Sequence, residues 1–283
     1  MTEQDDTGPS SESRTTARII RWRDGIRSEP TDTLAVEEPL EIRIGYRDPR
    51  KGRVHRSVAI TMRTPGDDLA LALGFLHSES ILENPSAVQL IEQSSDNVVR
   101  IELQDSAVFD PLRLERNFYV TSSCGVCGKS SLESLSTAGF ATIDDDGFRI
   151  SLEFLYKLPD QLGPRQQLFR LTGGNHATAL FDGIGRIVRV TEDVGRHNAM
   201  DKLVGHTLQD QLLPLHRHGI LVSGRASFEL MQKALAARCP ILVAVGAPSS
   251  LAVELAQEYN LTLVGFLKKN GCNIYSGGFR ITD

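Results

Sequence analysis

The sequence predicts a layered α/β fold, because its last third alternates apolar, strand-like runs with amphipathic helical ones. Three strands are predicted over residues 219–222, 241–245 and 261–266, and two helices lie between them over 226–237 and 251–259. A βαβαβ order implies parallel strands with helices packed on the sheet. Ligands bind such sheets at the carboxyl ends of the strands.

The segments upstream predict a smaller α+β part and the remaining elements of the core. Period-two alternation of apolar residues predicts strands over 40–46, 57–62 and 99–103. Asp67 follows a turn and is placed to cap the next helix. Later patterns predict two helices, a hairpin that turns at Asp182-Gly183, and one more helix, over residues 151–162, 164–171, 176–191 and 196–208.

Composition limits the classes of function. The chain has 283 residues and a formal net charge of −5, which argues against a general nucleic-acid binder. No apolar run is long enough for a membrane span, and the N-terminus lacks the features of a signal peptide. We therefore expect a cytoplasmic protein with no membrane partner, in a compartment where thiols stay reduced.

We divide the chain into four segments. Residues 1–16 are rich in Ser, Thr, Asp and Glu and are expected to be a disordered tail. An N-terminal α+β part follows over 17–122, then a loop around two cysteines over 123–136. The α/β core is expected over 137–283.

Two of the four cysteines, Cys124 and Cys127, form a CxxC after a strand-like run. Backbone N–H groups and a nearby cation such as Lys129 lower the pKa of a thiol in this setting and favour the thiolate. The chemistry to explain is sulfur chemistry, namely redox exchange, metal ligation or persulfide transfer. Cys239 precedes an apolar strand and is expected to be an inert, buried thiol.

Other uses of a CxxC fit the sequence less well. A zinc site needs two more ligands, and no second CxxC or HxxxH occurs; His216 and His218 lie in a polar loop. The chain is too large for a plain thioredoxin module. A P-loop requires glycine where Ser123 stands, and a zinc deaminase requires proline there together with an upstream His-x-Glu. A purely structural CxxC stays open.

Polar residues cluster at the predicted strand ends and helix starts. The loops over 223–227, 246–250 and 267–271 carry small residues, hydroxyls, one Arg and two Lys, which suits a phosphate held at helix N-termini. Arg196, His197 and Asn198 are either ligand contacts or part of a solvated capping loop. Asn175 and His176 follow a glycine pair that permits close approach of a ligand, and they have the same status.

Several separated motifs together resemble the FdhD family of sulfur carriers needed for formate dehydrogenase activity. The resemblance covers the chain from about residue 18 onward and rests on these stretches: Met62–Asp67, Leu73–Leu76, Ser123–Ser130, Thr172–Ala177, Glu192–Ala199, Asp201-Lys202, Val222–Glu229 and Phe266–Tyr275.

The resemblance implies a fold and an activity. The family fold is similar to cytidine deaminase, an αβα sandwich, here with a smaller subdomain and a dimeric assembly. A cysteine desulfurase donates persulfide sulfur, which passes to the molybdenum bis(guanine dinucleotide) cofactor for use by formate dehydrogenase. The cofactor is then a bound client, and no permanent metal is expected.

The resemblance also implies site residues. Cys124 would carry the persulfide, with Cys127 assisting or sharing the role. The cofactor-binding segment corresponds to Phe266, Leu267, Lys268, Lys269, Asn270 and Gly271. Lysines stand in this segment where an arginine is expected, and they keep the charge but lose bidentate binding of phosphate. Further contacts are expected from Ser223, Arg225, His197 and Asn198.

Two other functions stay open. A non-catalytic chaperone would bind the molybdenum cofactor and deliver it to its enzyme without using the cysteines. A dithiol oxidoreductase would cycle through a disulfide between Cys124 and Cys127.

Overall fold

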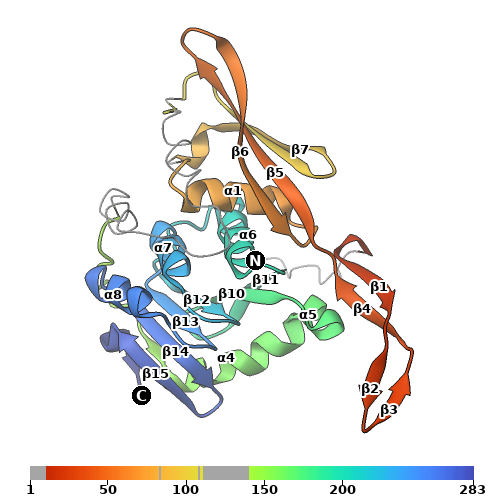
Figure 1. Cartoon of the computed structure of the whole chain (residues 1–283). Helices are drawn as coiled ribbons and strands as arrows, with labels where there is room; N and C mark the ends of the chain where they lie inside the picture. The colour runs from red at the N-terminus through yellow and green to blue at the C-terminus, as the bar shows by residue number, and fades with distance from the viewer. Residues whose placement is uncertain (1–10, 83, 108, 111–139) are drawn as a thin grey trace.

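A six-stranded sheet with helices on both faces forms the core of the computed structural model (Figure 1), which describes residues 11–82, 84–107, 109–110 and 140–283. Its strand order is β11-β10-β12-β13-β14-β15. The bounds are β10 His176–Asp182, β11 Ile187–Asp193, β12 His218–Val222, β13 Ile241–Ala244, β14 Thr262–Lys268 and β15 Gly271–Ser276. Strands β12, β13 and β14 pair in parallel, which confirms the predicted βαβαβ unit.

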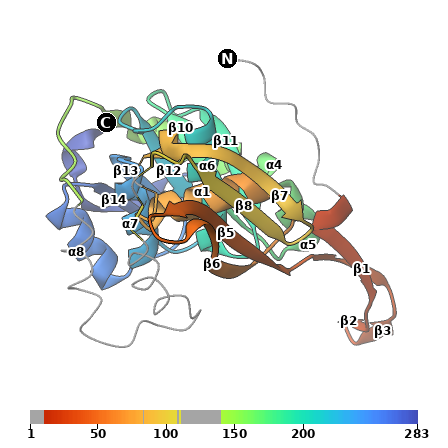
Figure 2. The same ribbon diagram turned by 90° about the horizontal axis from the view of Figure 1, so that it is seen from above.

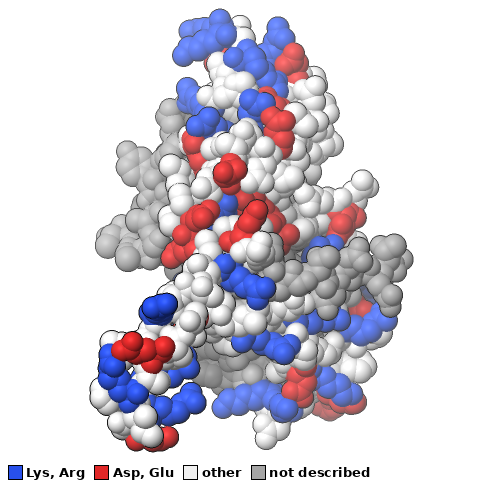
Figure 3. All heavy atoms as spheres, turned by 90° about the vertical axis from the view of Figure 1, so that its right-hand side faces the viewer, with Lys and Arg blue, Asp and Glu red and all other residues white. Residues whose placement is uncertain are grey.

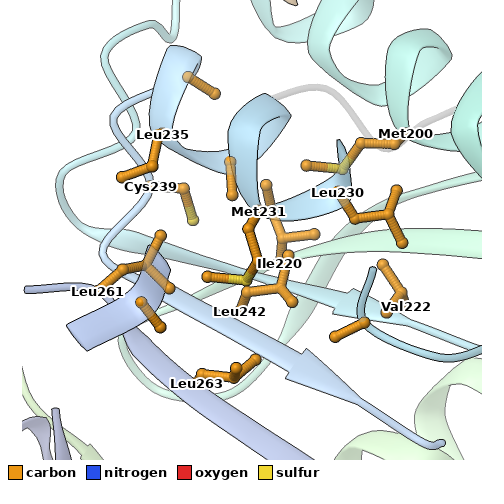
Figure 4. Packing of buried hydrophobic residues seen from close by; sticks show 14 of the residues in the cluster. Met200, Ile220, Val222, Leu230, Met231, Leu235, Cys239, Leu242, Leu261 and Leu263 are labelled. Carbon is orange, nitrogen blue, oxygen red and sulfur yellow. The ribbon is translucent and has the colours of Figure 1, made fainter. Parts of the chain in front are cut away.

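One face of the sheet packs against α6 (Arg196–Gln209), α7 (Phe228–Ala236) and α8 (Ser250–Glu258). Figure 4 shows this cluster, in which Met200 and Met231 from the helices meet Ile220 and Leu242 from the strands. The predicted inert thiol, Cys239, is buried here, and burial raises its pKa to about 12.

The opposite face packs against α4 (Leu152–Arg165), with α5 (Gln167–Thr172) at its end. Leu155, Leu158 and Leu162 of α4 lie in the same buried cluster as Leu221 and Val243 of the sheet. Successive strand residues therefore point to opposite helical layers. The layered α/β fold predicted from the sequence is confirmed.

Antiparallel strands lie at both edges of the sheet, and the sequence predicted those at one edge only. Strands β10 and β11 form the predicted hairpin. Strand β14 continues to Lys268 and turns directly into antiparallel β15. The prediction of a third strand-end loop over 267–271 is therefore wrong for residues 267, 268 and 271, and the turn is limited to 269–270. Residues there pair across a bulged hairpin, whose apolar residue Leu267 is buried.

A second sheet of order β6-β5-β8-β7 forms the N-terminal part, with α1 (Asp68–Ser78) on one face. Its strands are β5 Glu38–Asp48, β6 Gly52–Arg63, β7 Val88–Ser95 and β8 Val98–Leu103, and the short helix η2 (Pro85–Ala87) precedes β7. Basic side chains gather where the β5–β6 hairpin projects at the top of Figure 3. Asp67 does not cap α1 with its side chain, because its carboxylate pairs with His206 at 3.1 Å.

A ribbon at the start of the described chain projects from the body in both ribbon views (Figures 1 and 2). It comprises η1 Ser11–Ser13, β1 Arg14–Arg18, β2 Arg21–Arg23, β3 Ile26–Ser28 and β4 Thr31–Ala35. The predicted disordered tail is thus wrong for residues 11–16, because Thr15 and Thr16 pair with β4. Short strands β9 (Ile150–Ser151) and β16 (Ile281–Thr282) pair beyond the core sheet, after η3 (Gly278–Arg280).

Helices α1 and α6 join the two parts through an unusually close crossing. A Cβ atom on Gly74 would lie 1.8 Å from the carbonyl oxygen of Asp201, and one on Gly205 would lie 1.8 Å from that of Ala70. Beside the crossing, Lys233 Nζ lies 2.9 Å from Asp201 and 3.0 Å from Glu79. No helix in the described ranges is long and apolar enough to cross a membrane.

We expect Gly205→Ala to destabilise the protein by about 1–3 kcal/mol or more, because backbone must move to admit the methyl group. Gly163→Ala is the matched control, since it also lies in a helix but its Cβ would meet nothing within 4 Å; we expect it to be neutral or to stabilise by up to about 1 kcal/mol. Urea unfolding curves measure both changes. Equal midpoints for the two variants would contradict the close crossing.

Candidate functional site

The loops after the parallel strands converge at one edge of the core sheet. The backbone N–H of Gly246 donates to Gly224 O at 2.9 Å, and that of Phe266 donates to Gly246 O at 3.1 Å. The ends of β12, β13 and β14 are thereby bonded in sequence. The predicted gathering of strand ends is confirmed for these residues.

Helix α6 begins at the same edge and brings His197 to the first turn of α7. His197 Nε2 lies 2.6 Å from Glu229 Oε2 and 3.3 Å from Ser227 Oγ. The hydrogen bond from His197 holds the pKa of Glu229 below its ordinary value, despite partial burial. Sequence analysis assigned no role to Glu229, because its partner is distant in the sequence and only the folded chain brings the two together.

Arg196 supplies positive charge at this edge, and His176 lies beside it. Partial burial lowers the pKa of His176, and the nearby charges of Arg196 and His197 lower it further. The Nε atom of Arg196 is buried and has no hydrogen-bond partner within the described part of the chain. Arg225 is exposed close by, on the loop after β12. The cluster has donors and positive charge to offer an anion.

Two helix N-termini add further donors. Helix α6 starts after Gly195 and helix α7 after Ser227, and neither cap residue makes a side-chain hydrogen bond to its helix. The first N–H groups of a helix lack intrahelical partners and carry partial positive charge. Helix α8 differs, because the Ser249 side chain accepts from Ala252 N at 3.2 Å. The uncapped starts of α6 and α7 suit a phosphate.

A buried ion pair anchors the start of α6. Lys202 Nζ lies 2.8 Å from Asp193 Oδ2, and both side chains are almost completely buried. Asp193 also accepts from the backbone N–H of Thr64 and of Gly195, at 3.1 and 2.8 Å. Asp193 is therefore not part of a solvated capping loop, which was one of the two alternatives for this stretch.

The side-chain amide of Asn198 forms hydrogen bonds to other residues of the protein. Its Nδ2 donates to Met62 O at 2.7 Å and to Asp193 Oδ1 at 3.1 Å, and its Oδ1 accepts from Thr61 at 3.0 Å. These bonds tie α6 to β6. The predicted ligand contact of Asn198 stays untested, and its amide groups already have partners.

The predicted cofactor segment divides into buried and exposed residues. Phe266 is 42% exposed and has φ of 54°, a left-handed backbone conformation that is strained for a bulky residue. Leu267 is buried against α4, whereas Lys268 and Asn270 are exposed and Gly271 starts β15. Lys269 Nζ pairs with Asp160 of α4 at 2.8 Å. Phe266, Lys268, Lys269 and Asn270 are therefore all accessible, and Leu267 is the buried member of the segment.

The predicted catalytic pair, Cys124 and Cys127, lies outside the described residues. Of the two cysteines that the structure does describe, Cys272 is half-buried, and burial raises its pKa as it does that of Cys239. Neither has the thiolate character of a nucleophile. Among the described residues, no group of three or more His, Cys, Asp or Glu side chains is arranged to hold a metal ion.

Comparisons with known proteins agree on one family. The model of the FdhD/NarQ family matches residues 35–282. A sulfur carrier protein FdhD from Streptomyces avermitilis is 51% identical over 274 residues, which cover 93% of this chain and 94% of that protein. One from Sulfurisphaera tokodaii is 39% identical over 265 residues, covering 93% and 97%.

A solved structure has the same fold. The crystal structure of a protein from Desulfotalea psychrophila, described as a formate dehydrogenase accessory protein, superposes with a TM-score of 0.72 and 20% identity. The match covers 95% of this chain and 99% of that one. At this identity the likeness shows the fold alone, and the similarity to cytidine deaminase stays a prediction.

We expect the pKa of His176 to rise when Arg196 is replaced by methionine, because a positive charge that disfavours protonation is removed. NMR titration of the His176 ring protons measures this rise. Arg186→Met is the control, since Arg186 pairs with Asp182 at the other end of β10. An unchanged titration in Arg196→Met would show that the two charges do not interact.

Proposed function

The chain belongs to the FdhD/NarQ family, and from this premise we propose that it is a sulfur carrier that supplies sulfur for formate dehydrogenase activity. The observation that carries the proposal is the cationic strand edge around Arg196, with its two uncapped helix starts, in a chain that also holds a CxxC. Such an edge suits a phosphate-bearing client, and a CxxC suits a sulfur nucleophile.

The proposed sulfur donor is the persulfide of a cysteine desulfurase. The thiolate of Cys124 attacks the terminal sulfur of that persulfide and forms a new S–S bond. The S–S bond of the donor breaks, and the desulfurase cysteine leaves as a thiolate, so there is no net oxidation. A CxxC thiol of low pKa would be in its nucleophilic form at neutral pH, and Cys127 assists or shares the role.

The proposed acceptor is the molybdenum bis(guanine dinucleotide) cofactor, bound as a client and then used by formate dehydrogenase. Its phosphates would lie against the cluster of Arg196, His176 and His197, with Arg225 and Lys268 exposed nearby. Arginine offers a planar set of donors to phosphate, and a lysine adds charge. We further propose that the chain works as a cytoplasmic homodimer.

A cofactor-binding chaperone is the second candidate. The observation that favours it is that no cysteine among the described residues takes part in the cationic edge, since Cys239 is buried in the core and Cys272 packs on the α4 side of the sheet. In that case Arg225→Ala or Lys268→Ala would impair formate dehydrogenase maturation, whereas substitution of Cys124 or Cys127 would not.

We expect added sulfur on Cys124 or Cys127 after incubation with a cysteine desulfurase and cysteine. Mass spectrometry of the CxxC peptide would show one extra sulfur atom, removable by reductant. Cys124→Ser and Cys127→Ser would identify which thiol carries it.

Cys272→Ser is the matched control for these variants, because burial raises the pKa of that thiol and it should not compete as a nucleophile. Loading of the CxxC peptide should be as complete in this variant as in the wild type. If a competent desulfurase adds no sulfur to the CxxC peptide of the wild type, the carrier proposal fails and the chaperone replaces it.

A further inference from the structure

The N-terminal ribbon, residues 14–35, is a two-stranded element that stands away from the body of the molecule (Figures 1 and 2). Strand β1 pairs with β4 and strand β2 pairs with β3, and between the two pairs the backbone N–H of Ile19 donates to Pro30 O at 3.0 Å. An isolated two-stranded hairpin is at best marginally stable in water. A partner that covers one face of the ribbon would therefore stabilise it.

The two faces of the ribbon differ in exposure. Arg18, Ile20 and Trp22 are exposed, whereas the residues that alternate with them are half-buried: Ala17, Ile19 and Arg21. Alternate residues of a strand point to the same face. The face that carries Arg18, Ile20 and Trp22 is called the Trp22 face below. With Ile20 60% exposed and Trp22 66% exposed, it presents two large apolar side chains to solvent, as protein-binding surfaces do.

The Trp22 face is also positively charged. Arg14 and Arg18 lie on it, are exposed, and form no ion pair within the described part of the chain. Arg27, by contrast, pairs with Glu29 of the ribbon itself at 2.6 Å. The ribbon holds five Arg against three Asp and Glu, in a chain whose formal net charge is −5. Free arginines beside a tryptophan favour a partner that offers an apolar pocket bordered by carboxylates.

The base of the ribbon is fixed beside the candidate site. Strand β4 packs against α5 (Figure 1), and a Cβ atom on Gly174 would lie 3.8 Å from the Cβ of Ala35. Gly174 is followed in the chain by Asn175 and by His176, which lies at the strand edge beside Arg196. A protein bound along the ribbon is therefore held next to the edge at which the phosphates of the client are proposed to lie.

We propose that the Trp22 face docks the apoprotein of formate dehydrogenase, through a surface of that protein that combines an apolar pocket with carboxylates. Ile20 and Trp22 fill the pocket, and Arg14 and Arg18 pair with the carboxylates. The inference rests on the proposed function, because it names the surface that receives the enzyme served by the carrier. The position of the ribbon favours this enzyme over the sulfur donor, since the acceptor of a finished cofactor must approach the edge that holds it.

Biolayer interferometry with the immobilised, cofactor-free formate dehydrogenase of the same organism tests this docking surface. Ile20→Ala and Ile26→Ala form one matched pair, because Ile26 is 72% exposed on the opposite face, across from Arg23. Arg18→Glu and Arg23→Glu form the second pair and reverse the same charge on opposite faces. We expect about tenfold weaker binding from Ile20→Ala and from Arg18→Glu. At physiological salt, which screens charges outside the contact, we expect less than about twofold from the two controls.

Sulfur loading of the CxxC by a cysteine desulfurase, measured on the same variants, separates this inference from the proposed function. Normal loading, with a loss of binding confined to the Trp22 face, supports the docking surface. Normal loading with unchanged binding in these variants, with equal losses on both faces, or with no binding by the wild type would overturn the docking surface and leave the carrier function standing.

Two further results are decisive. A change in self-association in the Trp22-face variants, seen by analytical ultracentrifugation without a change in binding to the enzyme, would assign the face to a second copy of the chain and overturn the inference. A wild type that accepts no sulfur would overturn the carrier function, and the binding data would still decide the docking surface.

Discussion

The buried ion pair between Asp193 and Lys202 is the constraint on which the rest of this arrangement depends. Burying two charges costs several kcal/mol per ion, and the cost is recovered only when every remaining bond is made. Lys202 therefore also donates to the carbonyl oxygens of Thr64 and Glu192, at 2.9 and 3.3 Å. These contacts require that three segments meet at one point: the end of β11, the start of α6 and the segment after β6. Any other arrangement would leave a buried charge without a partner. The N-terminal sheet is thereby joined to the core.

The same constraint positions the candidate site. Helix α6 is held at its start by this pair and further along by its close crossing with α1, where Gly205 admits the backbone of Ala70. A helix fixed at both places cannot slide or rotate, so its first turn presents Arg196 and His197 to the strand edge in one orientation. Groups held ready in this way bind a ligand without a further entropic cost of ordering them.

Local sequence patterns were sufficient to predict most of the core elements, but they were insufficient to predict the polar contacts. The strands and helices from β12 to β14 were predicted because apolar runs and helical periodicity are local properties, and the β10–β11 hairpin was predicted from Asp182-Gly183. Lys202 and Asn198 look like surface residues in the sequence, because nothing nearby shows that Asp193 and Met62 will meet them. For the same reason the role of Asp67 was wrong, since its partner, His206, is distant in the sequence. Which polar atoms remain available for a ligand is a property of the folded chain alone.

Some polar atoms of the site are already bonded within the protein, and others remain available to a ligand. Ligand binding at the site is therefore expected to depend on pH. Asp193, Lys202 and Asn198 make internal bonds, whereas Arg196 Nε has no hydrogen-bond partner among the described residues. Burial and the charge of Arg196 keep His176 neutral near pH 7, because they lower its pKa. An anion bound beside it acts in the opposite direction and raises that pKa, so binding takes up a proton as the pH falls towards the lowered value. If a phosphate binds at this edge as proposed, its binding should therefore strengthen in mild acid, where His176 becomes protonated.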